Sequence, residues 1–571
     1  MFQGACAALP RWESDVTAPG LRGFVLEAPP GDEENLLSTV LAALAQSFTV
    51  QPEKQVQPEK PAPPESGAPR VPGTGAHRRT WLDTFDWRLY RAGLTLQFEQ
   101  ARRGGRLLLA RTDGTPQGEQ AVAGWPRRPP LDLPDGPVRD RIAVLIRPRA
   151  LLPIVRAVST ASVTRLLNAD GKTVARLVAE HVTVTAPGQA ATTAELAPRL
   201  AVTEVRGYPG PARRASALLA SVPGVTHASQ EVFIAALTAL GRHPADYSSS
   251  VAAEITAEMP APVAVARLLL RLLDTCESNV DGVLRDIDTE FLHDLRVAVR
   301  RTRSAIKLLG AVLPDELTVH YKTEFKWLGD VTTPVRDLDV HLLGFDALAG
   351  QLEAASPADL EPLRAFLARR RAREFRRLAA ALRGPRFRAI ADDWRKALLE
   401  VRDSDGLRRP EAGGGFPRRR RPTAEALARS TTGRSFRRIA AQGSAITRES
   451  APESLHDLRK RAKELRYLLE FFAPLHDPVA YRKVVGDLKQ LQDCLGEFQD
   501  SEVQRDEIRT LADAMLAERA APAATLLAMG EIAAKLARSQ VEAREEFADR
   551  FARFAGPAGR ERVRVLLEGR P

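Results

Sequence analysis

The sequence predicts an α+β multidomain chain, in which an antiparallel β-rich domain is followed by an all-α helical region. Between about residues 81 and 207, short runs rich in Leu, Val, Ile and Thr are separated by Gly, Asp and Asn, a pattern typical of antiparallel strands. Beyond about residue 245 these runs stop, and apolar residues recur every three or four positions, which indicates helices. The 571 residues are enough for about two to four domains.

Composition and charge narrow the class of protein. The chain has 83 Lys and Arg against 72 Asp and Glu, a net charge of +11 and 44% hydrophobic residues, which is a globular and basic composition. Its three cysteines are far apart, which excludes a disulfide framework or a zinc knuckle and fits a reducing compartment. Neither a secretory signal nor a run of roughly 20 apolar residues is visible, so we expect a cytoplasmic protein without membrane insertion.

The order of the elements predicts the domain limits. The strand-rich domain is expected at 21–220, with an extended insertion at about 50–75 that contains the repeat QPEKQVQPEK and many prolines. A helical linker is expected at 221–261. The helical domain is expected at 262–555, and a loop rich in Gly and Pro at about 403–422 divides it into two sub-bundles.

The helical region contains an internal repeat. A shift of 163 residues aligns LHDLRVAVRRTRSAIKLL (292–309) with LHDLRKRAKELRYLLEFF (455–472), and FKWLGDVTTPVRDLDV (325–340) with LKQLQDCLGEFQDSEV (488–503). The polar residues that it pairs are His293 with His456, Arg296 with Arg459, Arg300 with Lys463, Arg303 with Arg466, Lys326 with Lys489, and Asp337 with Asp500. One shift that aligns two separate motifs indicates an internal duplication.

The basic residues of each repeat fall on one helix face. At about 100° per residue, positions 0, 3, 7, 10 and 14 from His293 lie within an arc of roughly 80°. We call the two faces the basic stripes: His293, Arg296, Arg300, Arg303 and Lys307 in the first, and His456, Arg459, Lys463 and Arg466 in the second. A charged face is usually only solvated, but it then mixes acidic with basic residues, whereas these stripes contain no carboxylate. The stripes therefore favour binding of an anion in a cationic groove or channel.

The paired motif H-x-x-R-x-x-x-[RK]-x-x-R resembles the conserved histidine α-helical domain, CHAD, over about residues 262–555. The resemblance implies an internally duplicated helical bundle whose basic channel binds inorganic polyphosphate. The phosphate-contacting residues that it implies are the two basic stripes with Lys326 and Lys489, and further candidates are Arg373, Arg377, Arg434 and Arg437. Polyphosphate is a suitable ligand physically, because it carries about one charge per phosphate and arginine pairs well with phosphate oxygens. The resemblance also favours association with polyphosphate-rich granules.

Nucleic acid is the competing polyanion. The sequence has no RNP-like aromatic motif, zinc finger or recognition-helix signature, and single-strand binders normally supply stacking rings. We therefore expect no specific nucleic-acid binding. Polyphosphate binding itself requires neither a cofactor nor a metal.

The segment WLDTFDWRLYRAGLTLQFE (81–99) resembles the D-T-x-D-x-x-L-x-x-x-G-L-x-L pattern of CYTH domains. This resemblance implies an antiparallel β-barrel of the triphosphate-tunnel type, whose active members hydrolyse triphosphates with Mg²⁺ or Mn²⁺. The carboxylates and cations of such a site are depleted here: Glu27 stands alone in the first strand, Gln97 and Glu99 replace basic residues, and Glu204 is single. We favour a barrel without catalysis and keep the metal-dependent inorganic triphosphatase, with the helical domain delivering substrate, as the alternative.

Overall fold

The computed structural model describes residues 23–27, 32–53, 76–101, 104–124, 133–188, 192–228, 231–251, 253–407, 422–447 and 449–568. The chain divides into two compact units, Met1–Tyr247 and Ser248–Pro571, which we call the sheet unit and the helical unit. Most of the predicted insertion at 50–75 and of the predicted loop at 403–422 lies outside the described residues.

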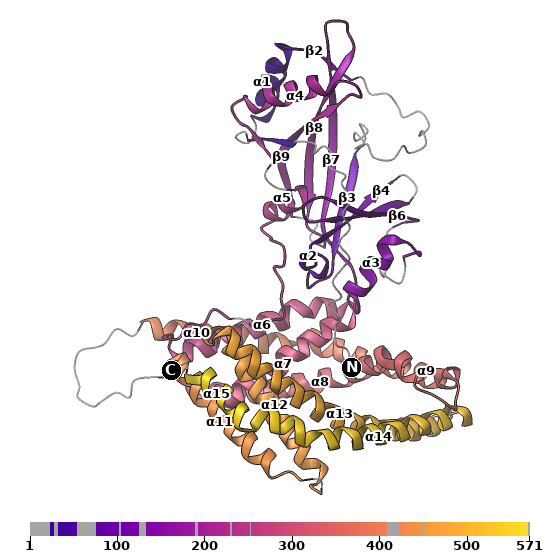
Figure 1. Ribbon diagram of the computed structural model, residues 1–571, viewed down its shortest axis with the longest axis vertical. Helices are drawn as coiled ribbons and strands as arrows, with labels where there is room; N and C mark the ends of the chain where they lie inside the picture. Colours follow the sequence, from indigo (N-terminus) through magenta and orange to yellow (C-terminus); the bar gives the residue numbers. More distant parts are fainter. Residues whose placement is uncertain are drawn as a thin grey trace, which may run out of the picture. The chain divides into compact units, whose positions relative to one another are not determined.

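The sheet unit is built on one antiparallel sheet of ten strands (Figure 1). The strand order is β10-β1-β9-β8-β7-β3-β4-β5-β6, and β2 pairs with β7. The strands are β1 (Gly23–Leu26), β2 (Thr49–Pro52), β3 (His77–Asp83), β4 (Leu94–Gln100), β5 (Gly105–Arg111), β6 (Pro116–Val122), β7 (Leu152–Leu167), β8 (Thr173–Thr185), β9 (Thr193–Glu204) and β10 (Val225–His227). The helices of this unit are α1 (Glu33–Ala45), α2 (Arg88–Arg91), α3 (Pro137–Ile146), α4 (Pro209–Ala220) and α5 (Val232–Ala239). The predicted antiparallel strands are thus confirmed.

The prediction of a closed barrel is wrong. Closure needs hydrogen bonds between the two outer strands of the order, and no described ladder joins β10 to β6. Helices cover the apolar side chains of the sheet instead: α1 and α4 share a core with β1, β8 and β9, α5 with β7 and β8, and α3 with β4 and β5. Three separate cores therefore replace the single interior of a barrel.

The acidic residues of the D-T-x-D motif stabilise a turn. Asp83 is buried, and its carboxylate accepts hydrogen bonds from the backbone N–H groups of Thr84, Leu89 and Tyr90. Desolvation raises the pKa of Asp83 to about 6 despite these bonds. Asp86 accepts a hydrogen bond from Arg88 at 2.9 Å. Both carboxylates are thus used in holding the turn from β3 into α2.

The helical unit confirms the prediction of an all-helical C-terminal region (Figure 1). Its helices are α6 (Ala261–Leu284), α7 (Thr289–Leu309), α8 (Asp315–Ala349), α9 (Glu361–Arg383), α10 (Pro385–Leu407), α11 (Ala424–Ser444), α12 (Pro452–Phe471), α13 (Pro478–Ala517), α14 (Ala523–Ala555) and α15 (Pro557–Glu568). Short 3₁₀ turns occupy Gly310–Val312, Pro357–Leu360 and Ala473–Leu475. Among the described residues, none of the helices has both the length and the apolarity that crossing a membrane requires.

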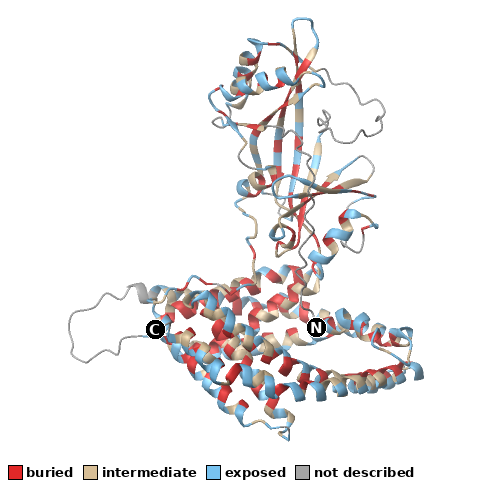
Figure 2. Cartoon of the chain, in the orientation of Figure 1, coloured by how far each residue is buried: buried red, intermediate tan, exposed pale blue. Residues whose placement is uncertain are grey.

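Helix α7 shows how the sequence places the first stripe. Asp288 caps the helix, because its carboxylate accepts the N–H groups of Glu290 and Phe291. One face, which includes Leu295 and Val299, is buried, whereas Arg300 and Arg303 are exposed. Figure 2 shows buried and exposed positions alternating along the helices of the helical unit. Burial of the apolar face therefore fixes the direction in which the basic residues point.

Several elements of the helical unit begin 163 residues apart. The pairs are α6 at Ala261 with α11 at Ala424, α7 at Thr289 with α12 at Pro452, the 3₁₀ turns at Gly310 and Ala473, and α8 at Asp315 with α13 at Pro478. The first of these pairs is joined by reciprocal hydrogen bonds: Ala261 N–H donates to the Pro422 carbonyl at 3.0 Å, and Ala424 N–H donates to the Met259 carbonyl at 2.7 Å. The two donor residues are 163 residues apart, and so are the two acceptor residues.

Candidate anion-binding site

Two ion pairs connect α7 and α12. Lys307 Nζ lies 2.5 Å from Glu464 Oε1, and Arg301 Nη2 lies 2.6 Å from Glu470 Oε2. The 163-residue shift relates Arg301 to Glu464 and Lys307 to Glu470. The two ion pairs therefore occupy equivalent positions, and the cation of each pair corresponds to the carboxylate of the other. The helices that carry the two basic stripes are therefore held in contact.

The stripes meet at Arg300 and Lys463, which the shift also relates. The Arg300 guanidinium lies 5.9 Å from the centre of the Tyr467 ring on α12. Burial, together with the charges of Arg459 and Arg300, lowers the pKa of Lys463 to about 8, and Asp500 opposes this only in part. Cations from both stripes therefore act on the same half-buried ammonium group.

The next turn contains Arg296 and Arg459. Arg296 donates to Thr333 Oγ1 at 2.6 Å, whereas Arg459 donates to Asp500 Oδ1 at 2.9 Å. Burial lowers the pKa of Arg296, and neighbouring arginines add to this while Asp337 opposes it. The acidic residues Asp337 and Asp500 thus act beside an arginine of each stripe, as expected of residues that orient a guanidinium.

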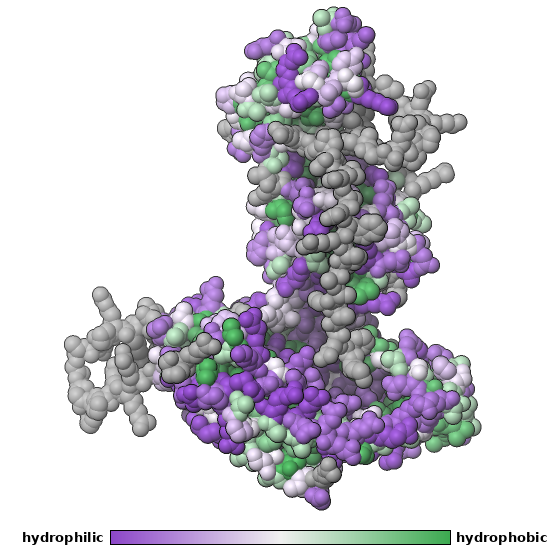
Figure 3. Space-filling model, viewed as in Figure 1, coloured by the Kyte–Doolittle hydropathy of each residue, from purple (hydrophilic) through white to green (hydrophobic). Residues whose placement is uncertain are grey.

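The ends of the stripes differ in their partners. Arg303 Nη1 packs against Gly329, where an added Cβ would lie only 2.9 Å away. Its counterpart Arg466 donates to Glu470 Oε1 at 2.8 Å and to Gln492, the counterpart of Gly329. His293 and His456 are half-buried one turn before Arg296 and Arg459. Hydrophilic residues dominate much of the visible surface of the helical unit (Figure 3).

The other predicted contact residues lie elsewhere in the helical unit. Lys326 is paired with Asp330 at 3.0 Å, and Lys489 is exposed on α13. Arg434 and Arg437 are exposed on α11. Arg373 and Arg377 line a separate cavity of about 170 Å³, whose other lining residues are Phe366, Arg369, Arg370, Glu374, Ala514 and Glu518.

The predicted phosphate contacts leave out four arginines of the helical unit. Arg301 lies between the stripes as an ion-pair partner, and Arg336 is one of the charges that lower the pKa of Arg296. Arg369 and Arg370 line the same cavity as Arg373. The run ARRRAREFRR contains the last two, so its density of arginine was the available signal.

The carboxylates of the sheet unit do not fit a divalent metal. Glu99 accepts hydrogen bonds from Arg106 at 2.7 Å and Gln97 at 2.8 Å, and Glu27 accepts one from Thr226 at 2.9 Å. Within the described ranges, no group of three or more His, Cys, Asp or Glu side chains is placed to hold a metal ion. Divalent-metal sites need several converging carboxylates, so we derive no metal-dependent step.

We accordingly expect no release of phosphate from tripolyphosphate with Mg²⁺ or Mn²⁺. The measurement is phosphate release by the full chain, and a Glu99→Gln variant is the control. Activity that disappears in this variant would contradict the expectation and assign the reaction to the sheet unit.

Comparison with known proteins bears on the helical unit. Residues 267–509 match the family model of the CHAD domain. The chain is similar to the crystal structure of the CHAD domain from the plant Ricinus communis, with 22% identity over 57% of this chain and 97% of that chain and a TM-score of 0.40. It is also similar to PptA from Streptomyces chartreusis, with 17% identity over 51% and 99% of the two chains and a TM-score of 0.38.

A search of curated proteins found no match. The resemblance of the sheet unit to CYTH domains therefore stays a prediction. The match of the family model covers both basic stripes, from His293 to Arg466. The helical region of this protein thus contains a CHAD domain.

Proposed function

We propose that the helical unit binds inorganic polyphosphate at the two basic stripes of α7 and α12. The observation that supports this most is the contact of α7 with α12, which brings Arg300 close to Lys463, so that burial and the charges of Arg459 and Arg300 together lower the pKa of Lys463. A polyanion relieves this repulsion, because each phosphate brings about one negative charge without bases or rings that need a stacking partner. Association with polyphosphate-rich granules would follow from the same affinity.

We also propose that the helical unit is an internal duplication. The equal spacing of four pairs of elements, the reciprocal bonds of Ala261 and Ala424, and the exchanged ion pairs of Arg301 and Lys307 support it. A duplicated site presents equivalent cations from two directions. A linear, uniform polymer such as polyphosphate suits this arrangement, because it offers the same groups along its whole length.

The pH dependence of binding tests the role of Lys463. In the free protein its pKa is about 8, below the ordinary value of 10.5, so it is largely neutral above that pH. Phosphate oxygens stabilise the charged form, so binding takes up a proton above pH 8, and affinity should fall by up to about tenfold per unit between pH 8 and 10. Titration calorimetry in two buffers of different ionisation enthalpy measures the proton uptake.

The matched control is Lys463→Arg, which stays charged throughout this range. We expect the variant to bind polyphosphate with little change in affinity between pH 8 and 10. Equal pH dependence in the variant and the wild type would show that Lys463 does not contact the ligand.

A further inference from the structure

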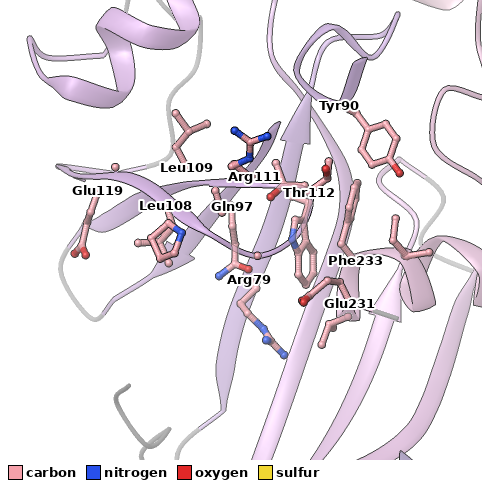
Figure 4. Close-up of a pocket in the computed structure, with 18 of the residues that line it drawn as sticks. Arg79, Tyr90, Gln97, Leu108, Leu109, Arg111, Thr112, Glu119, Glu231 and Phe233 are labelled. Carbon is pink, nitrogen blue, oxygen red and sulfur yellow. The ribbon is translucent and has the colours of Figure 1, made fainter. Parts of the chain in front are cut away.

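The sheet unit contains a pocket of about 620 Å³ that shares no residue with the proposed polyphosphate site (Figure 4). It is lined by β3, β4, β5, the start of β6 and the start of α5. Aromatic rings form part of its wall: Trp81 stacks on Phe233 with ring centres 5.7 Å apart, and Tyr90 lies 6.4 Å from the same Phe233. Apolar walls with a few polar groups are typical of small-molecule sites.

The arginines of this pocket already have acidic partners. Arg79 lies 2.6 Å from Glu180, and Arg106 lies 2.6 Å from Glu99 and 3.1 Å from Glu119. The more exposed Arg111 is 3.7 Å from Asp113. A phosphate ligand would have to separate these pairs or compete with their carboxylates. The pocket is therefore a poor site for an anion, although three arginines line it.

Glu231 also lines the pocket but, unlike the arginines, is not part of an ion pair among the described residues. Across the described residues, the Glu231 carboxylate forms no ion pair or hydrogen bond, although its charge acts on the half-buried Arg199. Figure 4 shows Glu231 and Phe233 next to each other on one side of the pocket, away from Leu108 and Glu119. A carboxylate that forms no ion pair or hydrogen bond among the described residues thus lies beside an aromatic wall.

The charged side chains that line the pocket are Arg79, Arg106, Arg111, Glu119 and Glu231. Each of the three arginines is paired with a carboxylate: Arg79 with Glu180, Arg106 with Glu99 and Glu119, and Arg111 with Asp113. Glu231 is therefore the lining carboxylate that these pairs do not use.

We infer that this pocket binds a small organic cation. An aromatic or apolar body would pack against Trp81, Tyr90 and Phe233, and an ammonium group would pair with Glu231. Aromatic faces attract cations as well as apolar groups, and a carboxylate adds charge-assisted hydrogen bonds. The polar side chains of Thr95 and Gln97 line the same pocket and supply further hydrogen-bonding groups. This site and its ligand class are independent of polyphosphate binding by the helical unit.

Two probes with the same ring and opposite charge test the inference. Phenethylammonium and 3-phenylpropionate are titrated separately into the full chain, and binding is measured by calorimetry and by saturation transfer to the probe. We expect phenethylammonium to bind at least about tenfold more tightly than 3-phenylpropionate. Glu231→Gln should weaken phenethylammonium about tenfold, whereas Glu195→Gln, an exposed position on β9 outside the pocket, should leave it unchanged.

Two results would overturn the inference: equal or tighter binding of the carboxylate probe, or an affinity for phenethylammonium that Glu231→Gln does not change. Because Glu231 is exposed, its variant should fold normally, and the thermal transition of each variant confirms this before titration. Polyphosphate binding by the same variants should remain at the wild-type level, which separates this test from that of the helical unit.

Discussion

Replacing Arg300 and Lys463 together by glutamine is expected to weaken polyphosphate binding by about a hundredfold. In the proposed complex each residue supplies one charge-assisted contact to phosphate, and the loss of one such contact costs about tenfold in affinity. Neither side chain forms an ion pair within the described residues, so the change removes binding charge without breaking a structural contact between carboxylate and cation. The measurement is calorimetric titration of the full chain with polyphosphate at about 150 mM salt.

The matched control removes the same charge from another part of the helical unit. Arg509 and Arg519 are exposed and lie on the C-terminal part of α13 and just after it. Arg509→Gln with Arg519→Gln should change the affinity by less than about threefold, through long-range charge alone. Equal losses in the two double variants would mean that net charge, and not the stripes, governs binding.

Glu470→Gln is expected to lower the free energy of unfolding of the helical unit by about 2 kcal/mol. The Glu470 carboxylate accepts hydrogen bonds from Arg301 at 2.6 Å and from Arg466 at 2.8 Å, and the Arg301 side chain is only 16% exposed. Loss of the negative charge leaves this largely buried guanidinium without its main partner. Urea unfolding of the full chain, followed by circular dichroism of the helices, measures the change.

The pair of Lys326 with Asp330 provides the comparison, because both side chains are more than half exposed. Asp330→Asn should change the free energy of unfolding by no more than about 0.5 kcal/mol. If Glu470→Gln were as mild as Asp330→Asn, the cross-helix pairs would not be what holds α7 against α12.

The strands and helices could be predicted from the sequence because their patterns are local. The alternation of GLTLQFEQ places Leu96 and Phe98 in a core of the sheet unit. The spacing of Leu295 and Val299 directs one face of α7 into the helical core and leaves the basic residues on another face. Closure of the sheet depends instead on whether strands far apart in sequence pair. The family pattern at 81–99 carries no information on β6 and β10, so the expected barrel was wrong.

The candidate site, too, was predictable where the pattern is local and unpredictable where it depends on contacts between distant segments. Helical spacing was sufficient to place each basic stripe on one face, but it did not indicate which carboxylates the neighbouring helix would present. Glu464 and Glu470 lie on α12 beside the second stripe and pair with Lys307, Arg301 and Arg466. The candidate cations therefore have unequal environments: some are fixed in ion pairs, while Arg300 and Lys463 meet without a carboxylate of their own.

The most direct test of the central claim is titration of the full chain with polyphosphate at about 150 mM salt, with duplex DNA as competitor. The account predicts tight binding that excess DNA does not displace and that Arg296→Ala with Arg459→Ala greatly weakens. Weak binding, or binding that DNA displaces as readily as added polyphosphate does, would contradict it and reduce the basic stripes to a general positive charge.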